Sequence, residues 1–477
     1  MYVRIPAIAL DFQCFFSWGK KEVTPVEGTK KAIRFNLTPP RILVVGFAAI
    51  VLLGAFLLML PISNADGIPL PFLDALFTST SATCVTGLIV VDTGTHFTVF
   101  GQVVIMLLIQ IGGLGFMTMA TLFALALKKK ISLKERLILQ EALNQGSMEG
   151  IVRLIRKVIL FAVCIEGTAA VLFSVRWAFD LPLGKAIYFG IFHAVSFFNN
   201  AGFDLFGSVS GPFSSLTSYV GDPIINLVSM LLIILGGIGF IVLSDLVEYK
   251  RTRKLSLHTK IVLTMTGLLI VIGTVVIFIF EFTNTRTLGS LNGWEKFWAS
   301  LFQSVSPRTA GANTIDIGAM RQASQFFMVL LMFIGASPGS TGGGIKTTTF
   351  AILIGAVFAM IRGKEDIVIY RYRLAKDRIF KAVTLTLLSL FLVIIVSMIL
   401  STTEDHSFLM ILFDTTSAFG TVGLSMGLTA DLTVFGKIMI SLMMFMGRLG
   451  PLTLAYAIGP KTEKELYRHP EGKMIIG

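Results

Sequence analysis

The sequence predicts an all-α polytopic membrane protein of four repeated helix–pore-helix–helix units, with eight transmembrane helices and four re-entrant half-helices around one central pore. The first observation is composition. Of the 477 residues, 54% are hydrophobic and 14% are charged, which is too little charge to cover a soluble protein of this size. The second is the length of the apolar runs, several of which reach the roughly 20 residues that cross a bilayer. The third is a short pattern that recurs four times.

The recurring pattern is a phenylalanine, a serine four residues later, and a glycine five or six residues after the serine. The glycines are Gly87, Gly202, Gly311 and Gly423, separated by 115, 109 and 112 residues. Offsets this regular indicate one structural unit used four times. The paired residues before these glycines are Phe77 and Ser81, Phe192 and Ser196, Phe302 and Ser306, and Phe413 and Ser417.

Each unit reads as a span, a half-helix, a turn and a second span. The units occupy residues 41–130, 151–250, 258–362 and 378–462, between an N-terminal segment 1–40 and a C-terminal tail 463–477. The first spans are expected near 42–62, 157–177, 261–282 and 381–402. The second spans are expected near 98–127, 225–247, 326–360 and 435–459.

The half-helices are expected near 72–82, 187–198, 295–306 and 408–418. A helix of ten or eleven residues rises only about 15 Å, about half of the hydrocarbon core. Non-helical backbone at membrane depth is tolerated only where protein shields it or where it lines water. Each half-helix is therefore expected to turn back as a re-entrant loop.

Basic residues set the predicted orientation. Both termini and the loops after the second, fourth and sixth spans hold 31 of the 40 Lys and Arg residues, and the opposite side holds seven. The positive-inside rule then predicts cytoplasmic termini and outward-facing turns. This topology accounts for the net charge of +12 without nucleic acid as a partner.

The glycine turns suit a selectivity filter for a monovalent cation, and we expect K⁺ to bind at the carbonyls of Gly87, Gly202, Gly311 and Gly423. Glycine reaches positive φ, so successive carbonyls can face one axis and replace an ion's hydration shell. The turns contain no Asp or Glu, whereas divalent cations usually recruit carboxylates. One such glycine could merely permit close packing, but four at matched offsets favour the filter. The predicted filter residues are Thr83, Cys84, Val85, Thr86, Gly87, Asn199, Asn200, Ala201, Gly202, Arg308, Thr309, Ala310, Gly311, Gly420, Thr421, Val422 and Gly423.

A second glycine motif lies in each closing span, at Gly112, Gly236, Gly335 and Gly447. In the first two copies it is typical of close packing or a kink. In the third, residues 335–344 hold too much glycine, and a proline, to stay helical. This stretch is expected to be an intramembrane loop that gates the pore. The predicted gate residues are Gly335, Ser337, Gly339, Ser340, Thr341, Gly342, Gly343, Gly344, Lys346 and Arg448.

Three further polar residues lie within expected helices. Arg448, in the middle of the last span, has either a gating role or a structural one as a partner for loop carbonyls. Glu166, also in the middle of a span, is as compatible with a structural hydrogen bond as with a place in the pore. His193 lies in a half-helix and is expected to serve packing.

The chain resembles the Trk/Ktr/HKT superfamily of potassium transporters across residues 35–465. The resemblance rests on the four units, the broken third closing span, and the stretches Ala82–Gly87, Phe198–Phe203, Pro307–Gly311 and Phe419–Leu424. The eight-span count resembles the KtrB type of bacterial subunit rather than the larger Trk type. One departure is Cys84, where the family carries threonine. A thiol there need not alter the carbonyl geometry.

The resemblance implies a potassium-translocating subunit in the bacterial cell membrane, with no cofactor of its own and possible stimulation by Na⁺. It implies a homodimer with one pore per chain, surrounded by membrane lipid. It also implies a cytoplasmic, nucleotide-binding regulatory ring (a KtrA-like subunit) on the basic inner face. By the same resemblance, 335–344 is the gate and Arg448 is its counterpart.

Two other classes of function were weighed against a channel-like pore. An ion-coupled secondary transporter of a monovalent cation with alternating access would need inverted repeats or mobile half-bundles, whereas these four repeats share one orientation. An intramembrane enzyme would need paired catalytic groups such as HExxH or two membrane aspartates. The sequence offers neither, and we expect no enzyme activity.

Overall fold

The computed structural model describes residues 38–115, 117–121, 133–142 and 151–458. This part of the chain is helical apart from a two-stranded antiparallel hairpin, β1 (Val368–Ile369) with β2 (Tyr372–Arg373). Most of the expected N-terminal segment 1–40, the whole tail 463–477, and the first unit beyond residue 121 lie outside the described residues.

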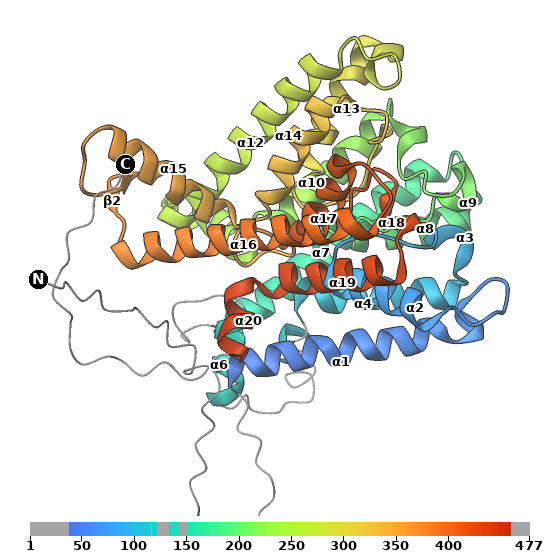
Figure 1. The fold of residues 1–477 in the computed structure, drawn as a ribbon, viewed down its shortest axis with the longest axis horizontal. Coiled ribbons are helices and arrows are strands. Elements are labelled where there is room, and N and C mark those ends of the chain that lie inside the picture. Colours follow the sequence, from blue (N-terminus) through green and yellow to red (C-terminus); the bar gives the residue numbers. More distant parts are fainter. Residues whose placement is uncertain (1–37, 116, 122–132, 143–150, 459–477) are drawn as a thin grey trace, which may run out of the picture. The chain divides into compact units, whose positions relative to one another are not determined.

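Four long helices open the units, close to where the apolar runs place them (Figure 1). They are α1 (Pro39–Met59), α7 (Ile151–Trp177), α12 (Leu257–Glu281) and α16 (Lys376–Thr403). Each is long and apolar enough to cross a membrane. Several begin where the sequence supplies helix-start signals, such as prolines at the first positions of α1 and the hydroxyl of Ser256, which caps α12.

A shorter helix follows each of these and ends at a glycine turn. The four are α2 (Phe72–Cys84), α8 (Leu183–Phe198), α13 (Gly293–Val305) and α17 (Phe408–Gly420). Helix α13 starts with a capping box between Asn292 and Glu295. The C-terminal turns of all four helices are buried, so their carbonyl ends point into protein rather than to the surface.

The closing spans expected at 98–127, 225–247 and 435–459 are broken. In the first two the break agrees with a kink, one of the two alternatives left open, and in the third it corrects the expectation of one helix. Helix α4 (Val99–Leu114) ends at Gly115, α10 (Pro223–Gly237) bends by 100° into α11 (Phe240–Thr252), and α19 (Val434–Leu449) bends by 91° into α20 (Pro451–Ile458). The breaks fall at Gly115, Gly239 and Gly450, whose φ values of 82°, 93° and 83° lie outside the helical region. The predicted break in the third unit is present between α14 (Gln322–Phe333) and α15 (Thr347–Ile361).

Short helices connect these elements: η2 (Pro61–Ser63), α3 (Thr93–His96), α6 (Leu133–Ala142), α9 (Gly207–Ser210), η3 (Thr217–Tyr219), η4 (Leu288–Ser290) and α18 (Leu428–Asp431). Within the described residues, four helices can span a membrane by length and composition, or six if each bent pair is one span. The structure is therefore a mostly helical membrane fold with several apolar helices and bent helix pairs.

The helices form a closed circle of contacts. Each closing helix packs on the short helix of the next unit: α4 on α8, α10 on α13, α14 on α17, and α19 on α2. The last of these pairs joins the end of the chain to its beginning. In Figure 1, α1 (blue) and α20 (red) also meet, where Arg41 Nε donates to the carbonyl of Ala457 at 2.7 Å.

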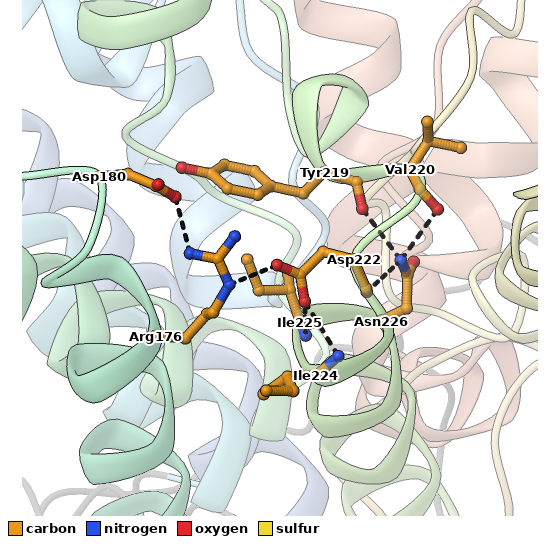
Figure 2. A network of polar contacts seen from close by, with 8 residues as sticks. All are labelled: Arg176, Asp180, Tyr219, Val220, Asp222, Ile224, Ile225 and Asn226. Atoms are coloured by element: carbon orange, nitrogen blue, oxygen red, sulfur yellow. Dashed lines mark hydrogen bonds and ion pairs between the residues drawn. The ribbon is translucent and has the colours of Figure 1, made fainter.

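An ion-pair network ties the second unit's opening and closing helices together (Figure 2). Arg176, at the end of α7, contacts Asp180 at 2.9 Å and Asp222 at 2.5 Å. Asp222 is the N-cap of α10 and also accepts from the backbone N–H groups of Ile224 and Ile225. One carboxylate thus caps α10 and anchors it to α7.

Candidate functional site

The four glycine turns share an unusual backbone conformation. The residue two positions before each glycine has left-handed φ, at 59°, 60°, 72° and 50° for Val85, Asn200, Thr309 and Thr421. The glycines themselves have φ of 92°, 69°, 74° and 93° in the same order. Left-handed φ is rare for non-glycine residues and for β-branched ones in particular. Four occurrences at one position show that the turns are built alike.

The repeated serines hold these turns from inside. In each unit the N–H of the residue before the glycine donates to the serine's carbonyl, at 2.8–2.9 Å. The hydroxyls of Ser81 and Ser417 accept from the N–H groups of Gly87 and Gly423, at 3.0 and 3.1 Å. The hydroxyls of Ser196 and Ser306 instead donate to the carbonyl of the residue after the glycine. The serine four residues after the phenylalanine thus fixes the turn.

The glycines form a ring. A methyl group on Gly87 would collide with the carbonyl oxygen of Ala201, the residue before the next glycine. The same holds around the circle: Gly202 meets Ala310 O, Gly311 meets Val422 O, and Gly423 meets Thr86 O. Each glycine is therefore required by the carbonyl of the following unit. The structure thus brings the predicted filter turns of all four units together. The side chain of Arg308 is the exception, because its Nη2 donates to Thr266 Oγ1 of α12 at 3.2 Å.

The four ring glycines line one cavity and carry no side chain that could fill the centre of the ring. The carbonyl oxygens that lie against the ring glycines are those of Thr86, Ala201, Ala310 and Val422. They belong to the residues directly before the glycines whose carbonyls were expected to bind K⁺, and they are neutral dipoles. Such a set can replace water around a monovalent cation. The C-terminal ends of the short helices add partial negative charge from the same side. This arrangement can bind and pass a dehydrated cation.

A cavity of about 340 Å³ lies against the ring on one side, and all four glycines line it. We call it the glycine cavity. Polar side chains that follow the turns also line it: Asp204, Asn313, Asp316 and Ser425. The mouth of the ring is thus polar, although the turns themselves carry no acid.

The second glycine motif packs on the other side of the turns. A side chain on Gly112, Gly236 or Gly447 would collide with the carbonyl of Thr83, Phe198 or Phe419, four residues before the ring glycine of the same unit. These glycines therefore allow close packing, and each lies within three residues of a helix break. Gly335 differs, because it packs on the carbonyl of Gly343 within the third unit's loop.

The loop 335–344 runs under the turns and touches three units. Gly343 N donates to the hydroxyl of Thr421 at 2.8 Å, and a side chain on Gly342 would collide with the hydroxyl of Thr309. Thr341 bonds to the second unit through Gly236 O and Phe198 O. The remaining predicted gate residues of the loop also make contacts. Ser337 N donates to Gly237 O, the hydroxyls of Ser337 and Thr347 share a hydrogen bond, and Ser340 Oγ donates to Ser337 O. Gly339 O accepts from Phe240 N, and Gly344 lies beside Gly420.

Two cations hold the loop in this position. Arg448 donates to the carbonyls of Thr341 in the loop and of Gly112 and Gly113 at the end of α4. Lys346 Nζ donates to Gly342 O at 2.7 Å. A cation passing here would meet both positive charges. The loop, Lys346 and Arg448 also line a second cavity of about 270 Å³, which we call the loop cavity.

The structure adds to what the sequence predicted for two buried residues. The role of Glu166 was left open, and His193 was expected only to serve packing. His193 accepts from Leu205 N at 3.3 Å and contacts Phe189 O at 2.8 Å, so it anchors the segment after the second turn as well as packing. Glu166 accepts hydrogen bonds from Gln110 and Asn199. No local sequence signal identifies the partners of Glu166, because Gln110 lies in α4 and Asn199 at the end of α8. Within the described residues, no cluster of three or more His, Cys, Asp or Glu side chains could hold a metal ion.

Comparison with known proteins shows the family to which the chain belongs. Residues 7–465 match the TrkH family, described as a cation transport protein. The Ktr system potassium uptake protein B of Bacillus subtilis is 50% identical over 447 residues, which cover 94% of this chain and 98% of that one. The potassium/sodium uptake protein NtpJ of Enterococcus hirae is 41% identical over 454 residues, 94% of this chain and 99% of that one.

The fold also matches a solved structure. The potassium transporter TrkH from Vibrio parahaemolyticus superposes with a TM-score of 0.69, covering 90% of this chain and 86% of that chain at 18% identity. At this identity the likeness concerns the fold. It agrees with the helical membrane architecture predicted from composition.

Proposed function

The chain belongs to the TrkH family of cation transport proteins, and from this premise we propose that it takes up potassium ions through one central pore, as the membrane subunit of a Ktr-type system. The ion would shed its water at the four-carbonyl ring and pass the loop 335–344. The named function of the B. subtilis and E. hirae relatives supports potassium as the cargo.

The single observation that carries the proposal is the closure of the ring. Each of the four ring glycines lies against a carbonyl of the next unit, and Gly423 returns to Thr86 of the first. A packing role would require close approach within a unit, as Gly112 and Gly447 show. It would not require four matched contacts between successive units around one opening.

In the proposed topology, the chain crosses the membrane eight times. Each broken closing helix counts as one span, and α2, α8, α13 and α17 are re-entrant half-helices. Both termini lie in the cytoplasm, so the glycine cavity opens outward and the loop cavity inward. The domain limits 41–130, 151–250, 258–362 and 378–462 follow from this topology.

The gate of the proposal is the loop 335–344 with Lys346 and Arg448. Support comes from its position under the third and fourth turns and from the two cations that hold it there. If the loop moved away together with Lys346 and Arg448, the ion pathway would lose both the obstructing polar loop and two positive charges.

The proposed assembly is a homodimer with one pore in each chain. A separate nucleotide-binding subunit would form a ring on its cytoplasmic side. The relative from B. subtilis is named as part of a Ktr system, which supports a system of several subunits. Sodium would act as an activator in this proposal; the printed name of the E. hirae relative gives sodium, with potassium, as an ion that is taken up.

The alternative is ion-coupled transport with alternating access. The closed ring argues for a fixed pore, because its four contacts join all four units and leave no pair of halves free to rock. Flux that requires a counter-gradient of a second ion would favour the alternative.

Rubidium uptake into liposomes that hold the purified chain tests the proposal. The account expects uptake that potassium competes for and that excess sodium does not. If the folded chain shows no uptake even with its regulatory ring, the pore proposal is wrong. If uptake appears only with a sodium or proton gradient, coupled transport is the better account.

A further inference from the structure

A buried polar cluster lies behind the second turn. Glu166, in the middle of α7, is 9% exposed. One carboxylate oxygen accepts from Asn199 Nδ2 at 3.0 Å and the other from Gln110 Nε2 at 3.2 Å. Asn199 Nδ2 also donates to Gln110 Oε1 at 2.8 Å. A carboxylate and two amides from three helices thus form one hydrogen-bonded triangle.

Asn199 connects this triangle to the ring. It lies three residues before Gly202 and is the C-cap of α8. Its amide also donates to the carbonyl of Val195 at 2.9 Å. The next residue, Asn200, has left-handed φ and bonds to the hydroxyl of Thr309 in the third turn at 3.0 Å. A change in the position of Asn199 would therefore reach two turns of the ring.

Gln110 connects the same triangle to the loop. It lies on the last turn of α4, followed by Gly112 and Gly113. The carbonyls of these glycines accept from Arg448, which also holds Thr341. A side chain on Gly113 would collide with the amide oxygen of Asn199. The end of α4 is thus clamped between the triangle on one side and the arginine on the other.

The chemistry of the triangle favours a positioning role over simple packing. An apolar side chain would fill the same space in a membrane helix at no desolvation cost, and a buried carboxylate is expensive there. Its two oxygens instead accept from two amides, and without the carboxylate the half-buried Gln110 Nε2 would lose the acceptor that it has here. Buried polar networks that are satisfied in one arrangement specify that arrangement.

We propose that Glu166 is a positioning residue for ion selectivity, which fixes the second turn through Asn199 and the end of α4 through Gln110. This inference rests on the proposed potassium pore. Without the carboxylate, the second turn and its contact with the third would lose their anchor, and the ring would discriminate less well between ions of different size. The end of α4 that Arg448 grips would loosen as well.

The test compares rubidium uptake, with potassium or sodium as competitor, in proteoliposomes of the wild-type chain and of Glu166→Ala and Glu166→Gln. The account expects Glu166→Ala to lower the preference for potassium over sodium by about tenfold, the scale of one unpaired buried donor. Glu166→Gln should recover much of it. Its remaining oxygen still accepts from one of the two amides.

The matched control is Glu281→Gln. Glu281 is also a buried carboxylate, and it accepts from Asn284, Thr287, Ser324 and the N–H of Arg321. Glu281 is the last residue of α12, and none of these partners is a predicted filter or gate residue. This variant should yield less folded protein, because an amide would face four donors, but its ion preference should stay that of wild type.

The outcomes separate the inference from the function it rests on. A wild-type chain that prefers potassium, with a Glu166→Ala variant that folds and prefers it equally, would refute the inference and leave the pore intact. A wild-type chain without flux would refute the pore itself. A double variant Glu166→Ala with Asn199→Ala should lose little more preference than either single variant, since both act through one contact. Additive losses would contradict the proposed coupling.

Discussion

Gly423 lies against the carbonyl oxygen of Thr86, although most of the chain separates them. A methyl group at this glycine would collide with that oxygen and would come within 3.0 Å of the Cα of Gly87. This contact joins the fourth turn to the first and closes the ring. A change at any ring glycine should therefore disturb the whole opening rather than one unit.

The first prediction concerns Gly311→Asp. The new side chain would meet Val422 O and would lie beside the Cα atoms of Gly423 and Gly202, so it must displace the ring. Its charge would also add an acidic ligand to a neutral site. We expect the preference of uptake for potassium over sodium to be lost or strongly reduced, as measured by competition against rubidium.

Gly67→Asp is the matched control for that variant. Gly67 also has positive φ, at 70°, but has open space around its Cα. Both variants carry the same backbone strain, on the order of 1 kcal/mol. Only the ring variant should change ion preference. Unchanged discrimination in Gly311→Asp would remove that glycine from the filter.

The second prediction concerns the loop. Deletion of residues 339–344 removes the plug under the turns and the carbonyl of Thr341 that Arg448 holds. We expect higher rubidium flux in liposomes without the regulatory ring than wild type gives. The measurement is the initial rate at equal amounts of folded protein. A deletion variant that folds but transports more slowly would count against a gate at this position.

The third prediction concerns Ser417→Ala. The Ser417 hydroxyl accepts from Gly423 N at 3.1 Å, and its loss would leave that half-buried donor unpaired. The expected cost is about 1 kcal/mol of stability. A smaller loss of potassium preference than in Gly311→Asp should accompany it. A variant with normal stability and normal preference would show that the serine's carbonyl alone holds the turn.

The fourth prediction separates stability from selectivity. Arg176→Met breaks the network of Figure 2 and leaves Asp222, a largely buried side chain, without its cation. We expect a loss of about 1–2 kcal/mol, seen as a lower melting temperature in detergent, with ion preference unchanged. Arg286→Met, at an exposed position, removes a similar charge and should have no such effect. Equal melting temperatures for the two variants would contradict the role of the network.

Much of the architecture could be predicted from the sequence because it repeats. The short helices and their turns lie close to the expected ranges, since the phenylalanine, serine and glycine of each copy act locally. The break at 335–344 was also predicted, because glycine and proline there exceed what a helix tolerates. Membership of the potassium transporter superfamily followed from the same residues and is confirmed by the family match.

Other features depend on contacts that local sequence does not show. At Gly115 and Gly239 the choice between close packing and a kink was left open, because a double glycine fits both a packed and a broken helix. The break at Gly450 was not predicted. The role of Glu166 was left open, since its partners lie 33 and 56 residues away on other helices. Four turns around one pore were predicted from the repeat, but which carbonyl lies against which glycine depends on contacts between successive units, which a single unit's sequence does not contain.

The most direct test of the central claim is a crystal structure of the chain grown with rubidium, read by anomalous scattering. The account predicts a rubidium peak on the axis of the ring, coordinated by the carbonyls of Thr86, Ala201, Ala310 and Val422 and reduced when potassium replaces rubidium. A well-ordered ring without a peak, with rubidium bound instead elsewhere among the helices, would contradict the claim that these four carbonyls select the ion.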